Sequence, residues 1–141
     1  MRTLAKVNNA WPRSFPPSCP PIKAAKRAVK VYRLVASDTI KPKDFVAKGF
    51  RRQFYAECAC EEFALSVLEK SGDLHVARQY FSTIGMAKLN KAAVGFITAE
   101  SGRVSEGPSN NVGKSHLNWW TYEGIEPHTF FSEILRIGVD I

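Results

Sequence analysis

A strand predicted over residues 28–35 carries a charge in the middle of an otherwise apolar face. The segment is rich in β-branched and aromatic residues, which is typical of a β-strand. Because side chains alternate along a strand, Arg33 shares its face with Val29, Val31 and Val35. Burying an unpaired guanidinium is very costly, so this residue must either pair with a carboxylate at the edge of the core or point into a cavity. Any fold of this chain has to provide one of these two environments.

A second strand is predicted over residues 116–122, and it is unusually aromatic. Alternation places one polar and aromatic set on the same face, namely His116, Asn118, Trp120 and Tyr122. Such a face can stack a planar ligand while the histidine and the amide bind its polar edge. The alternative is that Trp119 and Trp120 belong to the core and that His116 satisfies a buried hydrogen bond.

The basic residues of the chain are concentrated near its start. Five prolines fall within residues 12–21, so we expect residues 1–26 to form a proline-rich basic arm and residues 27–141 to form one folded domain. Residues 1–36 hold eight Lys and Arg and no acidic residue, which leaves 12 of the 20 basic residues and all 13 acidic ones in the rest. The body is therefore close to neutral. Any nucleic-acid contact is expected to be weak and to involve residues 1–36.

The cysteine content and the lack of long apolar segments bear on the cellular compartment. The chain has three cysteines, Cys19, Cys58 and Cys60, no apolar signal segment at its start, and no run of about 20 apolar residues that could cross a membrane. This combination favours a cytoplasmic protein with reduced thiols and no membrane partner. One Cys-x-Cys pair with scattered histidines is weak support for zinc, so no metal site is predicted.

The remaining segments predict a mixture of short elements. Residues 50–55 are expected to be irregular, with Arg51 and Arg52 as a solvated pair. The expected elements are a short helix over 37–49 ended by Gly49, a strand near 63–67, a helix over 74–81 capped by Asp73, a strand over 92–98 with 103–105 returning as a hairpin arm, and a last strand over 133–139. The sequence therefore predicts a single compact α+β domain of mostly antiparallel small sheets with a few short helices.

Three polar residues stand on successive predicted elements. Arg33 is on the first strand, Ser66 on a second strand that a helix follows, and His116 at the start of a late strand. This chain order resembles the ADP-ribosyltransferase superfamily. The resemblance spans residues 29–139 and implies an NAD-binding cleft between two small sheets. It departs from the family at the third position, where the usual residue is a glutamate, and a histidine cannot supply the same fixed negative charge.

The resemblance implies an enzyme that uses NAD as substrate and modifies a macromolecular acceptor, as a toxin or effector does. Arg33 would bind the pyrophosphate or a ribose, and Ser66 would orient the nicotinamide-side ribose. His116 would contact ribose hydroxyls or act as a general base. The NAD-binding set would be completed by Tyr32, Asn118, Trp120 and Tyr122.

Two other classes of function remain open on the sequence. One is a non-catalytic module that binds RNA or a protein through the basic arm and a surface formed by Trp119 and Trp120, because aromatic side chains beside basic ones stack unpaired bases. The other is a structural subunit whose exposed tryptophans form an interface. Residues 32–35 together with His116-x-x-Trp119-Trp120 also resemble a group of small bacterial proteins, a likeness that assigns no chemistry.

Overall fold

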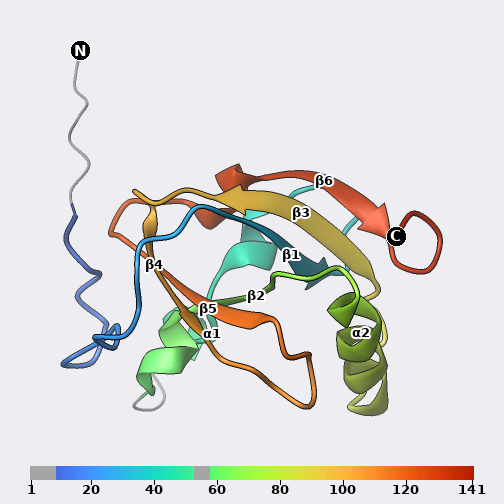
Figure 1. The fold of residues 1–141 in the computed structure, drawn as a ribbon, viewed down its shortest axis with the longest axis horizontal. Helices are drawn as coiled ribbons and strands as arrows, with labels where there is room; N and C mark the ends of the chain where they lie inside the picture. Colours follow the sequence, from blue (N-terminus) through green and yellow to red (C-terminus); the bar gives the residue numbers. More distant parts are fainter. Residues whose placement is uncertain (1–8, 53–57) are drawn as a thin grey trace.

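The sheet is built around β1 (Val29–Val35), a strand that the residue pattern predicts (Figure 1). The computed structural model describes residues 9–52 and 58–141 and places the strands in one antiparallel sheet of order β4-β5-β2-β1-β3-β6. The other strands are β2 (Leu65–Leu68), β3 (Lys91–Ile97), β4 (Gly102–Glu106), β5 (His116–Thr121) and β6 (Phe131–Arg136). The predicted α+β class is confirmed, but one six-stranded sheet takes the place of several small ones.

β1 and β2 separate soon after they meet. β1 pairs with β3 along its whole length, whereas it pairs with β2 only at Tyr32 and Leu68. Beyond that pair, residues 33–35 of β1 and 65–67 of β2 have no ladder register with each other. The sheet is therefore partly split between its third and fourth strands.

The two faces of the sheet have different covers. On one face, side chains such as Val31, Val67 and Trp119 pack against Phe45 of the short 3₁₀ helix η1 (Pro42–Phe45). On the other face, Tyr32 and neighbouring residues pack against the helix α2 (Asp73–Thr83). The remaining short elements are α1 (Lys48–Arg52), η2 (Cys60–Phe63) and η3 (Pro127–Phe130). Both faces of the central strands are thus buried.

Several predicted elements differ from the observed ones. The segment expected as one helix over 37–49 contains η1 and the start of α1, and Gly49 lies inside α1 instead of ending a helix. A Cβ atom at Gly49 would lie 2.8 Å from the Phe63 ring, so glycine allows α1 to pack closely on η2. Residues 50–52 belong to α1, and residues 53–55 lie outside the described residues.

β4 does not form the expected hairpin with β3. Both edges of β3 are occupied, one by β1 and the other by β6, so no edge is available to the strand that follows it. β4 pairs with β5 instead, at the opposite side of the sheet. The last strand runs from Phe131 to Arg136, slightly earlier than predicted.

The described part of the proline-rich arm, residues 9–26, packs on the domain. The Trp11 ring lies 4.4 Å from the Tyr122 ring, measured between centroids. Ala25 exchanges two backbone hydrogen bonds with Val104 of β4, at 2.9 and 2.8 Å. Ala24 is buried beside Trp120. This part of the arm is therefore an integral part of the fold and covers the end of β5.

The prediction of reduced thiols is wrong for two of the three cysteines. Cys19 of the arm and Cys60 of η2 form a disulfide across 41 positions of sequence. The pairing depends on where the arm docks, which the spacing of the cysteines does not reveal. The disulfide removes the argument for a reducing compartment. None of the helices within residues 9–52 and 58–141 is long and apolar enough to cross a membrane.

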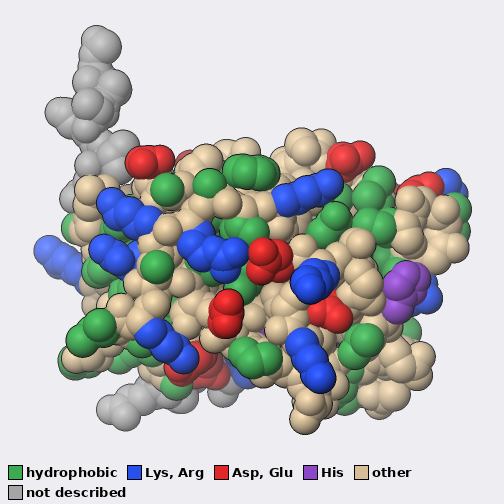
Figure 2. Space-filling view, in the orientation of Figure 1, with side chains coloured by type: hydrophobic (Ala, Val, Ile, Leu, Met, Phe, Trp, Pro, Cys, Tyr) green, Lys and Arg blue, Asp and Glu red, His purple; other side chains and the backbone are tan. Residues whose placement is uncertain are grey.

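Charged side chains of both signs are mixed on the surface in view (Figure 2). In the described part of the arm, Arg13, Lys23 and Lys26 are exposed, whereas Arg27, directly after the arm, pairs with Glu69 at 3.2 Å. A nucleic-acid-binding fold normally presents a basic stripe. Weak nucleic-acid binding through residues 1–36 stays a prediction, since part of that segment lies outside the described residues.

We expect loss of the disulfide to destabilise the domain. In a Cys19→Ser, Cys60→Ser variant the unfolded chain is no longer closed into a loop, which lowers the free energy of unfolding by about 2–4 kcal/mol. Urea unfolding followed by tryptophan fluorescence measures this. A dithiol reductant should lower the wild-type midpoint similarly and leave the variant unchanged. Cys58→Ser is the matched control with a smaller expected effect, and an unchanged midpoint in the double variant would contradict the pairing.

Candidate functional site

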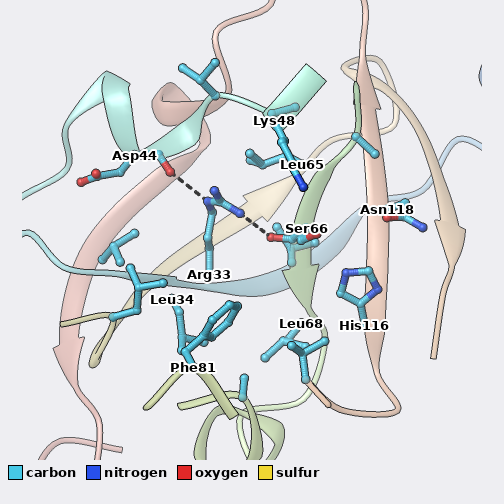
Figure 3. Close-up of a pocket in the computed structure, with 18 of the residues that line it drawn as sticks. Arg33, Leu34, Asp44, Lys48, Leu65, Ser66, Leu68, Phe81, His116 and Asn118 are labelled. Carbon is cyan, nitrogen blue, oxygen red and sulfur yellow. Dashed lines mark hydrogen bonds between the residues drawn. The ribbon is translucent and has the colours of Figure 1, made fainter. Parts of the chain in front are cut away.

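A cleft of about 830 Å³ lies where β1 and β2 separate (Figure 3). Its walls come from both strands, from η1 and α1, from η2, and from the C-terminal part of α2. Five of the residues singled out from the sequence line it, namely Tyr32, Arg33, Ser66, His116 and Asn118. The split in the sheet therefore creates the space in which the predicted site residues lie.

The two ends of the cleft differ in character. Figure 3 shows Lys48 and Leu65 at one end, Arg33 and Ser66 in the middle, and Leu68 and Phe81 at the other end. The end near α1 and η2 is charged and is lined by Lys48, Arg51, Glu61 and Glu62. The end near α2 is mainly apolar and is lined by Leu68, Ala77, Phe81, Met86 and Val112, with His116 beside them and Lys88, two residues after Met86, also lining the cleft. The cleft suits an elongated ligand with one polar and one apolar end.

Arg33 bridges the split in the sheet. Its Nε donates a hydrogen bond to the backbone carbonyl of Asp44 at 2.9 Å, and its Nη1 donates to the backbone carbonyl of Ser66 at 2.8 Å. The bond to Ser66 joins β1 to β2 where the two strands make no ladder pair, and the bond to Asp44 joins β1 to η1. Of the two environments expected for Arg33, the structure shows the cavity, since no carboxylate among the described residues forms an ion pair with it.

The cleft holds two guanidinium groups close enough to affect one another. Burial and then the nearby charge of Arg51 lower the pKa of Arg33 to about 10, against an opposing effect of Asp44. Arg33 therefore remains a cation at neutral pH. Arg51 donates to the backbone carbonyl of Val46 at 2.6 Å and, within the described part of the chain, forms no ion pair. Two such cations facing one cleft favour an anionic ligand.

Asp44 does not neutralise Arg33 directly. Only its backbone carbonyl accepts a hydrogen bond from the guanidinium, and its Oδ2 atom is buried with no hydrogen-bond partner. Figure 3 shows its carboxylate pointing away from Arg33. The positive charge in the middle of the cleft thus lacks a contacting counter-ion from this residue.

His116 is held in one tautomer. Its Nδ1 lies 2.8 Å from the backbone carbonyl of Gly107, and a carbonyl can only accept, so Nδ1 carries the proton and Nε2 keeps a lone pair. Burial lowers the pKa of His116, against the opposing effect of the Gly107 hydrogen bond. The imidazole is therefore neutral at neutral pH and presents an acceptor or a general base.

Asp73 fixes the loop that leads into His116. Its Oδ2 accepts from the backbone N–H of Ser115 at 2.9 Å and from its hydroxyl at 2.6 Å. A Cβ atom at Gly113 would lie 2.5 Å from the Asp73 side chain, so a glycine is required there. Asp73 makes no capping bond to α2, which corrects its predicted role as an N-cap.

The predicted catalytic residues meet in one cleft without forming a hydrogen-bonded triad. Ser66 pairs with Asn118 across β2 and β5, and Leu68 pairs with His116, so these side chains share a face. Arg33 lies on the other face of β1 and contacts Ser66 through its carbonyl only. A ligand in the cleft would be needed to connect the three groups.

The stacking role predicted for Trp120 and Tyr122 is wrong. Neither residue lines the cleft, and both are buried, at 1% and 5% exposure. The Trp120 indole donates to the carbonyl of Cys60 at 3.0 Å, and the Trp119 indole donates to the Ser101 hydroxyl at 3.1 Å. The exposed tryptophan surface required by the RNA-binding and interface alternatives is therefore absent too, because the arm and the core cover these rings.

Arg51, Phe81 and Met86 also line the cleft, although the sequence did not predict them as site residues. Arg51 is exposed, as predicted, but that it also lines the cleft depends on how α1 packs. Phe81 read as one more apolar residue on a helix. No local pattern distinguishes these residues from ordinary surface and core positions.

Comparison with known proteins adds no assignment. No protein-family model matches the sequence, and no curated protein or solved structure is detectably similar to it. Within the described residues, no three His, Cys, Asp or Glu side chains gather as metal ligands would.

Replacing Arg33 should destabilise the fold. Arg33→Leu leaves the carbonyls of Ser66 and Asp44 without their donor, which should lower the free energy of unfolding by about 2–4 kcal/mol. Arg33→Lys keeps the charge and should cost less. Lys30→Ala, on the same strand but outside the cleft, is the matched control, with a change of about 0.5 kcal/mol or less. Urea unfolding measures the free energy of unfolding of each variant and tests this ranking. Equal stability of Arg33→Leu and the wild type would contradict the bridging role.

Stability should fall with acid in a way that depends on His116. Because burial lowers its pKa in the folded chain, the unfolded chain binds the proton first as the pH falls below 6.5. The stabilisation is therefore present above that pH and is lost as the pH falls through the folded pKa. Urea midpoints measured from pH 8 to pH 5 should decline less in His116→Gln than in the wild type, and parallel profiles would contradict the burial effect.

Proposed function

We propose that this protein binds NAD in the cleft between β1 and β2 and acts as an ADP-ribosyltransferase-like enzyme on a macromolecular acceptor, as a toxin or effector does. The observation that carries the proposal is the unpaired positive charge of Arg33 and Arg51 in a cleft that Ser66 and His116 also line. The chain order of Arg33, Ser66 and His116 supports it independently.

The size of the cleft supports a dinucleotide. Ligand clefts in proteins span roughly 300–1,000 Å³, and this one is about 830 Å³. The polar groups are distributed along it: guanidinium groups in the middle and at one end, a hydroxyl and an amide beside them, and aliphatic and aromatic side chains at the far end. NAD has charged, hydroxyl-rich and planar aromatic parts in one molecule.

The pyrophosphate is the part of NAD that fits Arg33 and Arg51. Two hydrogen bonds of Arg33 go to backbone carbonyls, which leaves its Nη2 for a ligand. A bound pyrophosphate would relieve the repulsion between the two guanidinium groups and form charge-assisted hydrogen bonds with both. Asn118 and Ser66, which face each other across β2 and β5, can bind ribose hydroxyls.

Transfer from NAD breaks the bond between nicotinamide and its ribose. An acceptor nucleophile bonds to the ribose carbon, nicotinamide leaves with the bonding electrons, and the proton of the nucleophile passes to a base. The Nε2 lone pair of His116 can take that proton. His116 does not supply the negative charge that stabilises the developing cation in the family, so we expect NAD binding to be easier to detect than turnover.

The proposal predicts that NAD binding depends on Arg51. Isothermal titration of the wild type with NAD should give a saturable heat, and Arg51→Ala should weaken binding by about 5- to 20-fold because one charge-assisted contact to phosphate is lost. Arg13→Ala removes an exposed arginine outside the cleft and should bind as the wild type does. Arg33→Lys, if folded, should also bind more weakly.

Two results would contradict the proposal. One is the absence of heat at millimolar NAD with folded wild-type protein. The other is equal affinity of the wild type, Arg51→Ala and Arg33→Lys, which would place any NAD binding outside the cleft. Circular dichroism of each variant separates a loss of binding from a loss of fold.

A further inference from the structure

The apolar end of the cleft has the composition of a pocket for a flat ring. Leu68 of β2, Phe81 near the end of α2, and Met86 after it line this end. An aromatic ring and a thioether beside aliphatic side chains pack well on a planar heterocycle. Charged side chains gather at the other end, so the two ends of the cleft suit different parts of a dinucleotide.

His116 is the group at the apolar end whose hydrogen-bonding direction is fixed. Figure 3 shows its imidazole beside Ser66 and Leu68 of β2, and its pairing with Leu68 places it at this end. Nδ1 is committed to the Gly107 carbonyl, so the ring can offer only an acceptor, Nε2, to a ligand. No other hydrogen bond of this ring is formed with the described residues.

Asn118, one position further along the same face, has no such preference. Its amide carries a donor and an acceptor, and rotation exchanges them. It can therefore satisfy either kind of ligand group. Of these two side chains, His116 is therefore the one with a fixed hydrogen-bonding direction.

We infer that the apolar end binds the nicotinamide ring and that His116 Nε2 accepts a hydrogen bond from its carboxamide NH₂ group, so that the site selects nicotinamide over nicotinic acid. This inference rests on the proposed NAD binding and adds the chemical basis of its selectivity. His116 acts here as a specificity-determining residue. While Nε2 accepts from the carboxamide it cannot also take the proton of the nucleophile, so on this inference His116 positions the ring and another group receives that proton.

The selectivity follows from what the two rings present to an acceptor. A carboxamide donates, whereas a carboxylate has no hydrogen to donate and places an anionic oxygen against the Nε2 lone pair. The positive charges of Arg33 and Arg51 would by themselves favour the nicotinic acid form, because it carries an additional negative charge. Weaker binding of the acid form therefore cannot come from the general charge of the cleft and has to come from a local contact.

Calorimetry with three dinucleotides tests the inference. Nicotinic acid adenine dinucleotide should bind the wild type at least about tenfold more weakly than NAD at neutral pH. Nicotinamide hypoxanthine dinucleotide, which lacks the adenine amino group, should bind as NAD does. His116→Leu should lose affinity for NAD and bind NAD and the nicotinic acid analogue within about threefold of each other.

Gly107→Ala keeps the histidine but disturbs its position. A Cβ atom there would lie 3.2 Å from His116 Nδ1 and 2.9 Å from Asn118 Nδ2. This variant should narrow the difference between NAD and the acid analogue even if His116→Leu does not fold. Thermal unfolding of both variants identifies which of them are folded.

The outcomes separate this inference from the proposed function. If NAD does not bind, the proposed function fails. If NAD binds and the nicotinic acid analogue binds equally well, the proposed function stands and the role of His116 is wrong. If the hypoxanthine analogue is the weak ligand instead, the ring at the His116 end is adenine and the inference is overturned.

Discussion

The hydrogen bonds of Arg33 determine how the middle of this sheet is built. β1 and β2 make a single ladder pair, and the guanidinium then spans the growing gap to reach the carbonyls of Ser66 and Asp44. The planar guanidinium can donate to both carbonyls at once because its N–H groups point in different directions within one plane. Because a planar cation takes the place of ladder hydrogen bonds, the sheet stays continuous while a cleft opens within it. The most costly residue to bury is therefore the one that holds the cleft in shape.

Other segments of the fold support the two ends of that cleft. The arm covers Trp120, and the Cys19–Cys60 disulfide joins the arm to η2, whose next residues line the charged end. At the other end, Asp73 holds the loop that leads into His116, and the Gly107 carbonyl at the start of the same loop holds the imidazole. The cleft is thus supported by segments far apart in the sequence, and its charged and apolar ends are positioned by different parts of the chain.

Much of the local structure could be predicted because it follows from short-range constraints. The two-residue period identified β1 and β5, and the cost of burying a guanidinium limited Arg33 to two environments, one of which is observed. The burial of Trp119 and Trp120 agrees with one of the two alternatives that the sequence left open, and the sequence could not choose between them because alternation tells which face a side chain occupies but not what covers that face. The Cys19–Cys60 disulfide could not be predicted either, because the pairing depends on where the arm docks. Arg51 reaches the cleft because Gly49 lets α1 pack on Phe63, a contact that no local pattern encodes.

The central claim is that the guanidinium in the split of the sheet contacts a phosphate of NAD. Arginine Nε–H resonances of ¹⁵N-labelled protein report on this contact directly. Arg33 should give a resonance that is protected from exchange in the free protein, because its Nε–H is bonded to the Asp44 carbonyl, and that is missing from Arg33→Lys. The account predicts that this resonance and that of Arg51 shift together as NAD is added, and that both follow one saturation curve. Saturable NAD binding that leaves the Arg33 resonance unmoved would contradict it.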